Sequence, residues 1–446
     1  MIKKEEKEVE MNYKKYNVNE TKKRIDSEDF ITYCKKAKKD FTRKRKLTPQ
    51  DIVLYQINKR GLSTKMEILN FNNINDVQNI SSPGLFKQRE KLNPEVFTYL
   101  IQESLKDFYH KFPKEVKTYK GYVLKAIDGS DFEIPNTPRA REKYNGKLQN
   151  QCARVTVSIC YDILNKYTLD TIVSRYNYNE TEMFKKHLET LNHEKILGKF
   201  KSIVIADRNY KNLSFFYHAV KNKELFLIRI SSAVYEKENK GMKTDDEIIE
   251  IKYEYNRIRY YKDKDPELYN YYMNGNTIKL RCVKVILDTG EIEYLITNLN
   301  RKEFSTEDIK ELYNLRWKIE LNYRHLKNNL KIECITSSKE ILIKQDIYSQ
   351  VFVANMLQSF INDNDENIKQ EKYKNKMKTN TNMSVGIFKN TLIYILLENN
   401  AKKRSEMMDN FCLAIEKYIV PIKPGRKNER NNNPKNRYHI NQRKTF

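Results

Sequence analysis

The sequence predicts an α/β protein in which a mixed β-sheet core is preceded along the chain by a helical N-terminal domain and followed by C-terminal helices. Three observations support this: repeated helix-start signals in residues 48–112, alternating strand and helix patterns in residues 119–230, and helical periodicity in residues 305–419. With 446 residues, of which 39% are hydrophobic, the chain is long enough to bury the cores of two or three domains.

The composition argues against several classes of protein. No run of about 18 apolar residues is present, which argues against a transmembrane helix. The first ten residues, MIKKEEKEVE, contain no apolar segment and do not form a secretory signal. The six cysteines are scattered without a C-x-x-C pair, which argues against zinc and favours reduced thiols. We therefore expect a cytoplasmic protein.

The net charge of +25, with 84 lysines and arginines, predicts a polyanionic partner. AT-rich coding is an alternative cause, because it enriches lysine, asparagine, isoleucine and tyrosine without selection for binding. The basic tail, residues 421–446, is more informative, since it holds eight lysines or arginines against Glu429 alone. We expect it to be a phosphate-binding arm, with a passive solvated end as the alternative.

Two segments precede the predicted sheet. Residues 1–47 are charged and weakly periodic, which indicates a frayed leader with some helix. Residues 48–115 contain helix-start signals at Thr48-Pro49, Ser82-Pro83 and Asn93-Pro94, which predict a bundle of about four helices. A DNA-reading helix-turn-helix-like unit and a packing bundle without base contacts are equally compatible with this pattern.

Residues 116–230 predict the first part of the core. The strand-like segments are Tyr122–Ile127, Arg154–Tyr161, Tyr167–Ser174, Ser202–Ala206 and Leu225–Ile230, and the helical segments are Thr181–Asn192 and Leu213–Lys221. The resulting order is three strands, a helix, a strand, a helix and a strand. This is the order of a ribonuclease-H-like mixed sheet.

An insertion, residues 231–304, separates this part from the helix that would complete such a core. Glu247–Tyr255 and Thr277–Leu287 have strand-like alternation, and Asp288-Thr289-Gly290 predicts a hairpin turn into Glu291–Thr297. We interpret the insertion as a β subdomain, because a structureless loop of this length is uncommon.

The remaining chain is predicted to be mainly helical. We expect the second part of the core in residues 305–362, beginning with a helix capped near Ser305 or Thr306, then C-terminal helices in residues 363–420 and the basic tail. The helical segments are Glu340–Ile361, Ser384–Leu397 and Ser405–Ile419, with a polar linker at Asp363–Asn382.

The stretch Glu311–Lys331 combines two helical stripes. Tyr313, Arg316, Glu320 and Lys327 lie at offsets 0, 3, 7 and 14 and fall within about 60° on a regular helix. The adjoining apolar stripe consists of Leu312, Leu315, Ile319, Leu326 and Leu330. A carboxylate, a phenol and two cations are thus expected at the border of a buried face. We expect Trp317 to be a packing anchor and assign no chemistry to His325.

Two further acids follow apolar runs, namely Asp128 after Tyr122–Ile127 and Asp207 after Ser202–Ala206. With Glu320 they supply three oxygen ligands without histidine or cysteine, which suits Mg²⁺ or Mn²⁺. Two such ions can stabilise the attacking and leaving oxygens of a phosphodiester. Each acid also has a simpler interpretation: a turn residue for Asp128, and a local ion pair for Asp207 or Glu320.

At this point the chain resembles a known family, the DDE transposases of the bacterial insertion-sequence-four type. The resemblance rests on Asp128 in D-G-S, Asp207 in A-D-R-N-Y, and the signature Y-x2-R-x3-E-x6-K formed by Tyr313, Arg316, Glu320 and Lys327. The segment SSPGLFKQREKLNPEVF and the basic C-terminal run are also similar to the family. Asn209 departs from the glycine that many members have, although asparagine tolerates the same left-handed backbone.

The resemblance implies a ribonuclease-H-like fold and cut-and-paste DNA transposition of an insertion sequence. Asp128, Asp207 and Glu320 would be catalytic and hold two Mg²⁺ or Mn²⁺ ions, while Tyr313, Arg316 and Lys327 would bind DNA. The partners would be terminal inverted repeats and target DNA, joined by a homodimer. Two alternatives are a catalytically inactive DNA-binding remnant that represses transposition, and a simple nuclease or resolvase.

Overall fold

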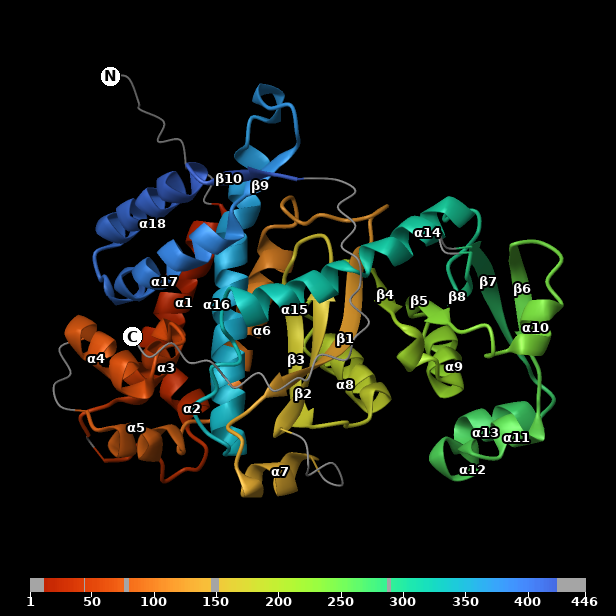
Figure 1. The fold of residues 1–446 in the computed structure, drawn as a ribbon, viewed down its shortest axis with the longest axis horizontal. Coiled ribbons are helices and arrows are strands. Elements are labelled where there is room, and N and C mark those ends of the chain that lie inside the picture. The colour runs from red at the N-terminus through yellow and green to blue at the C-terminus, as the bar shows by residue number, and fades with distance from the viewer. Residues whose placement is uncertain (1–11, 44, 76–79, 146–151, 287–289, 423–446) are drawn as a thin grey trace, which may run out of the picture.

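A single eight-stranded sheet runs through the middle of the molecule (Figure 1). The computed structural model describes residues 12–43, 45–75, 80–145, 152–286 and 290–422. The strands are β1 (Val123–Glu133), β2 (Arg154–Asp162), β3 (Thr168–Arg175), β4 (Ser202–Ala206), β5 (Leu225–Ile230), β6 (Asp246–Ile251), β7 (Ile278–Ile286) and β8 (Ile292–Thr297). Their order across the sheet is β3-β2-β1-β4-β5-β8-β7-β6.

The first five strands have the predicted ribonuclease-H-like arrangement. β1 pairs with β2 antiparallel and with β4 parallel, and β4 pairs with β5 parallel. The helices α8 (Glu180–His193) and α9 (Leu213–Lys221) provide the crossovers between strands. Every residue of β2 is buried, as expected for a strand covered on both faces. The predicted fold class is therefore confirmed.

The insertion extends this sheet instead of forming a sheet of its own. β8 pairs antiparallel with β5, and β7 and β6 continue outward. The predicted pairing of the two hairpin strands is confirmed, whereas residues 287–289 lie outside the described residues. The insertion also contains short helices that its alternating pattern did not indicate: α10 (Glu236–Lys240), α11 (Tyr255–Ile258), α12 (Tyr261–Lys264) and α13 (Pro266–Met273).

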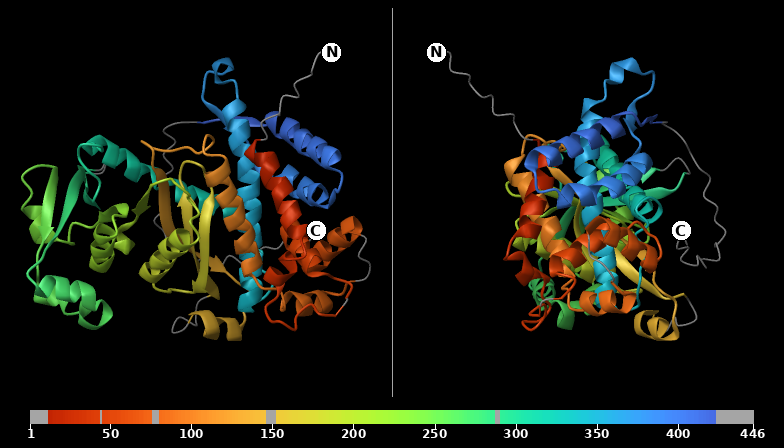
Figure 2. Two further views of the ribbon diagram at one scale, coloured as in Figure 1. Left: turned by 180° about the vertical axis from the view of Figure 1, so that it is seen from behind. Right: turned by 90° about the vertical axis from the view of Figure 1, so that its left-hand side faces the viewer.

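Helices from both ends of the chain pack together at the β3 side of the sheet (Figures 1 and 2). From the N-terminal part these are α1 (Tyr13–Asp26), α2 (Phe30–Cys34), α3 (Pro49–Asn58), α4 (Thr64–Asn75), α5 (Ser82–Arg89) and α6 (Glu95–Lys111). From the C-terminal part they are α16 (Glu340–Asn367), α17 (Thr381–Leu397) and α18 (Ala401–Glu416). No helix of the described ranges is long and apolar enough to cross a membrane.

The charged leader does contain helix, as predicted, but residues 13–34 are packed against the core and are not frayed. Helix α1 packs on α6 and α16, with Tyr13, Val18 and Ile25 buried. These few apolar residues lie on one helical face and are diluted by charged neighbours, so the overall composition concealed them. The four helices predicted after Thr48 are confirmed, and Thr48 forms a capping box with Asp51.

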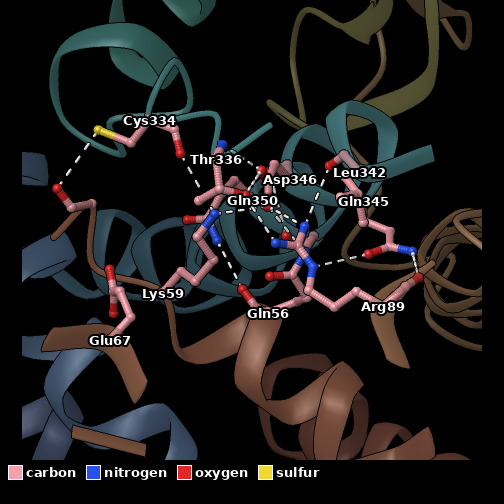
Figure 3. A network of polar contacts seen from close by, with 12 residues as sticks. Gln56, Lys59, Glu67, Arg89, Cys334, Thr336, Leu342, Gln345, Asp346 and Gln350 are labelled. Atoms are coloured by element: carbon pink, nitrogen blue, oxygen red, sulfur yellow. Dashed lines mark hydrogen bonds and ion pairs between the residues drawn. The ribbon is translucent and has the colours of Figure 1, made fainter. Parts of the chain in front are cut away.

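A buried polar network fixes these helices to the core (Figure 3). Asp346 of α16 is 1% exposed and accepts hydrogen bonds from Lys59 Nζ and Arg89 Nη2, each at 2.7 Å. Thr336 donates to the second carboxylate oxygen. These cations hold the pKa of Asp346 far below its ordinary value, although burial opposes them. The helical bundle is thus anchored to the long helix of the core.

The predicted linker at residues 363–382 is largely structured. Its first part continues α16 to Asn367, and β9 (Met377–Thr379) then pairs with β10 (Ile419–Pro421). Asp365 accepts from the backbone N–H and the hydroxyl of Thr379, which gives this polar stretch fixed partners. Residues 423–446 of the basic tail lie outside the described residues.

Candidate active site

Two neighbouring parallel strands bring Asp128 and Asp207 to the same part of the sheet. The pairing of β1 with β4 ends at Ile127 opposite Ala206, so each aspartate is the next residue along its own chain. The prediction that a strand ends at Asp128 is wrong, because β1 continues to Glu133 along β2. Asp207 does follow the end of β4, and its side chain accepts a hydrogen bond from the N–H of Arg208.

The predicted continuous helix is broken in the middle of the signature. Helix α14 (Thr306–Leu315) begins at the predicted cap, Ser305, and α15 (Lys318–Asn328) follows a tight turn at Arg316 and Trp317. The N–H groups in this turn bond three residues back, Arg316 to Tyr313 and Trp317 to Asn314, which is 3₁₀ geometry. The periodicity predicted a helix but gave no sign of this break.

Arg316 connects the three predicted carboxylates electrostatically. Its Nη2 atom donates to Glu320 Oε1 at 2.9 Å. The charges of Asp207, Glu320 and Asp128 all raise the pKa of Arg316, although its burial acts in the opposite direction. The structure therefore brings Asp128, Asp207 and Glu320 to one site from β1, β4 and α15. Glu320 does form an ion pair with Arg316, as its simpler interpretation predicts. The same arginine, however, also interacts with Asp128 and Asp207.

The carboxyl group of Asp128 is in an unfavourable environment for a negative charge. Burial raises its pKa to about 7, and the neighbouring charges of Glu320 and Glu180 act in the same direction. Arg316 and the Gly129 N–H oppose them. The backbone at Asp128 is held firmly, because the Tyr323 hydroxyl donates to its carbonyl at 2.7 Å. The backbone of Asp128 is thus fixed, while the nearby positive groups only partly offset the cost of a negative charge on its carboxylate.

Asp207 is held by an arginine that the sequence analysis missed. Arg229 of β5 contacts Asp207 Oδ1 at 3.1 Å and Glu293 of β8 at 2.5 Å. The insertion therefore contributes Glu293 to the surroundings of the site. No sequence motif points to Arg229 or Glu293. The parallel pairing of β4 with β5 places Arg229 beside Asp207, and the pairing of β5 with β8 brings Glu293 to Arg229.

Two other side chains at the site were also missed. Burial raises the pKa of Glu180, the first residue of α8, and the charges of Asp131 and Asp207 raise it further. Tyr210 follows Asp207 in the A-D-R-N-Y segment, and the charges of Asp128, Glu180 and Asp207 all raise the pKa of its phenol. The proximity of Tyr210 to Asp207 in sequence was the only signal available.

The other predicted residues have different surroundings. The Tyr313 hydroxyl is buried with no hydrogen-bond partner among the described residues, and burial raises its pKa to about 12. Lys327 donates from Nζ to the backbone oxygen of Asp131, and burial lowers its pKa. His325 is kept neutral by burial, which lowers its pKa to about 4. Trp317 is 40% exposed, so its interpretation as a packing anchor is wrong.

The donor set suits a hard divalent cation. Asp128, Asp207, Glu320 and Glu180 offer only carboxylate oxygens, the ligands that Mg²⁺ and Mn²⁺ prefer. Because burial raises the pKa of Asp128, a positive charge beside it would stabilise its ionised form. Within the described ranges, no three histidine, cysteine or acidic side chains are already grouped for a metal. The residues therefore fit such an ion chemically, while Arg316 compensates part of their charge.

Comparison with known proteins identifies related sequences. The family described as transposase DDE domain matches residues 119–356. Two matches from Escherichia coli are the putative transposase InsL of insertion sequence element IS186A, from strain K12, and the transposase of insertion sequence element IS421. Each is 34% identical over 90 residues, which is 20% of this chain and 24% of the relative. The chain thus matches about a quarter of the length of these relatives.

A solved structure gives a more distant comparison. The piggyBac transposase in a synaptic complex with hairpin DNA is 11% identical, with a TM-score of 0.42. The match covers 94% of this chain and 88% of the other.

Proposed function

The chain belongs to the transposase DDE domain family, and from this premise we propose that it catalyses cut-and-paste transposition of an insertion sequence of the insertion-sequence-four type. The reaction comprises hydrolysis of phosphodiesters at the transposon ends and joining of the freed ends to target DNA. Its DNA partners are the terminal inverted repeats and the target. Two copies of the chain bridge the two ends.

One observation supports this proposal most strongly: Asp128, Asp207 and Glu320 come together from β1, β4 and α15 around Arg316. The three lie 79 and 113 residues apart in sequence (128 to 207 and 207 to 320), so their convergence is a property of the fold. A simple surface ion pair between Arg316 and Glu320 does not need two aspartates from the adjoining strands. The inactive-remnant alternative has no observation in its favour, because all three carboxylates are retained.

We assign the metal-binding role to Asp128, Asp207 and Glu320. Bound Mg²⁺ or Mn²⁺, as a pair of ions, would activate the attacking oxygen and stabilise the departing one. β1, the end of β4 and α15 hold the backbones of these three residues in place, so only their side chains need to adjust when metal and DNA bind. Arg229 restrains Asp207 from the neighbouring strand.

The other three residues of the signature have separate roles in this proposal. Arg316 neutralises the carboxylates in the free protein and turns to a phosphate when DNA enters, since guanidinium groups bind phosphate well. Tyr313 brings a buried hydroxyl that lacks a partner among the described residues, and a movement of the chain on DNA binding must uncover it before it binds a phosphate oxygen. Lys327 holds the backbone of β1 at Asp131 and adds positive charge beside the cleaved strand.

Three substitutions test the proposal: Asp128→Asn, Asp207→Asn and Glu320→Gln. Each removes a candidate ligand with little change in size. Cleavage of DNA carrying the transposon end should fall by orders of magnitude, while binding in a gel-shift assay persists or improves because negative charge is removed near phosphate. Asp263→Asn removes an exposed carboxylate of α12 and is the matched control. Near-normal cleavage by any one of the three variants would exclude that residue as a ligand.

A further inference from the structure

The hydroxyl of Tyr210 is buried beside the catalytic carboxylates without a hydrogen bond. Tyr210 is 2% exposed, and its hydroxyl oxygen has no partner within the part of the chain that the structure describes. Its backbone is fixed, because its N–H donates to the carbonyl of Asp207 at 3.0 Å. Buried hydroxyl groups are normally paired, so an unpaired one at a functional site needs an explanation.

The surroundings restrict what the missing partner can be. The ring packs against Phe184 of α8 at a centroid distance of 5.2 Å, which limits its movement. Asp128 has the largest electrostatic influence on the phenol after burial, followed by Glu180 and Asp207. The neighbouring hydroxyl of Tyr323 already uses its one proton on the carbonyl oxygens of Asp128 and Val157, so it cannot donate to the phenol oxygen of Tyr210.

The hydroxyl is also closed to solvent, so the acceptor must be a group already inside the site. The Asp128 carboxylate fits this requirement best. A carboxylate that binds a cation is commonly oriented by a hydrogen bond to its other oxygen.

We propose that Tyr210 is a positioning residue whose hydroxyl donates a hydrogen bond to the Asp128 carboxylate when the site holds its divalent cation. This inference rests on the proposed function of Asp128 as a metal ligand. It assigns to Tyr210 the task of fixing one carboxylate rotamer, and the residue itself contacts neither DNA nor metal. In the metal-free protein the Tyr210 hydroxyl has no hydrogen-bond partner among the described residues.

Tyr210→Phe tests this with the full-length chain, because it removes only the hydroxyl oxygen. The Mn²⁺ concentration for half-maximal cleavage should rise about 10- to 100-fold, the usual effect of removing a hydrogen bond that orients a metal ligand. The rate at saturating Mn²⁺ should change much less. Tyr55→Phe is the matched control, since the Tyr55 hydroxyl is also buried without a partner among the described residues but lies in α3.

A second measurement does not depend on activity. Mn²⁺ should raise the unfolding temperature of the wild type, and this rise should need more Mn²⁺ in Tyr210→Phe but not in Tyr55→Phe. In an Asp128→Asn background, Tyr210→Phe should have no further effect on the Mn²⁺ response. Without metal, Tyr210→Phe should be at least as stable as the wild type, because it loses an unpaired buried group.

The outcomes separate this inference from the proposed function. Identical Mn²⁺ dependence of wild type and Tyr210→Phe, in cleavage and in unfolding, would overturn the role of Tyr210 alone. A metal-free Tyr210→Phe protein that is less stable than wild type would show that the hydroxyl already has a structural partner, and would also overturn it. A wild type that cleaves no transposon-end DNA, yet still shows the Tyr210-dependent Mn²⁺ response, would overturn the proposed function and leave the inference standing.

Discussion

Asp128 should make the metal-free protein less stable as the pH rises, and Asp128→Asn should remove this effect. Burial and neighbouring carboxylates raise the pKa of Asp128 from 3.8 to about 7. The folded state therefore holds the proton more tightly than the unfolded state. The stabilising contribution of the protonated group is fully present below pH 3.8 and is lost as the pH rises through about 7.

The size of the effect follows from the pKa shift. A difference of about three pKa units at about 1.4 kcal/mol each corresponds to about 4 kcal/mol. This is an upper bound, because the carboxyl group is not fully shielded from water. Asparagine is neutral throughout. The stability advantage of Asp128→Asn over the wild type should therefore grow by up to about 3 kcal/mol between pH 4.5 and pH 8, because about 1 kcal/mol of the contribution is already lost at pH 4.5.

Urea unfolding in the presence of a chelator measures this difference at the two pH values. Asp263→Asn is the control, since its exposed carboxylate should give the same small difference at both. Added Mg²⁺ should then stabilise the wild type at pH 8 and affect Asp128→Asn much less. An advantage of Asp128→Asn that is equal at pH 4.5 and pH 8 would refute the argument that the site destabilises its own carboxylate.

Three further predictions concern DNA contacts and the attachment of the helical bundle. Arg316→Ala should lower cleavage far more than non-specific DNA binding. Lys318→Ala should be almost silent in the same cleavage assay, because the charged neighbours of Lys318 are Lys166, Asp162 and Lys376; equal damage by the two variants would indicate general charge loss. Removing residues 423–446 should weaken duplex binding and flatten the plot of log affinity against log salt, and an unchanged slope would show a passive tail. Asp346→Ala should destabilise the protein by about 3–5 kcal/mol in thermal or urea unfolding, because it leaves two buried cations unpaired. Asp409→Ala, at an exposed ion pair, should cost less than about 1 kcal/mol.

The sequence was most informative where local signals and topology agreed. The strand and helix order of residues 119–230 was predictable because each segment is short, apolar and bounded by turn residues. The helix starts at Thr48 and Ser305 were predictable because both form capping boxes within three residues. The identification of Asp128 as a site residue stays a prediction, and the strand that was expected to end there continues past it.

What the sequence could not predict depends on contacts between distant segments. The break at Arg316 lies inside a good helical pattern, and the local periodicity is the same on both sides of it. Glu293 reaches Arg229 through the pairing of β5 with β8, a contact across more than 60 residues. Tyr13 and its neighbours are buried only because α6 and α16 provide a surface for them. Such effects need the three-dimensional arrangement.

The continuity of the sheet from β5 into β8 constrains how this protein can change. Deleting residues 231–304 would leave β5 with an unpaired row of backbone donors and acceptors, which is a template for aggregation. The insertion is therefore not a detachable module. In the intact protein β6 is the edge strand of the sheet. It carries Asp246, Glu247 and Glu250, and such charges discourage a second molecule from adding a strand. Evolution or engineering that shortens this region must supply another cover for β5.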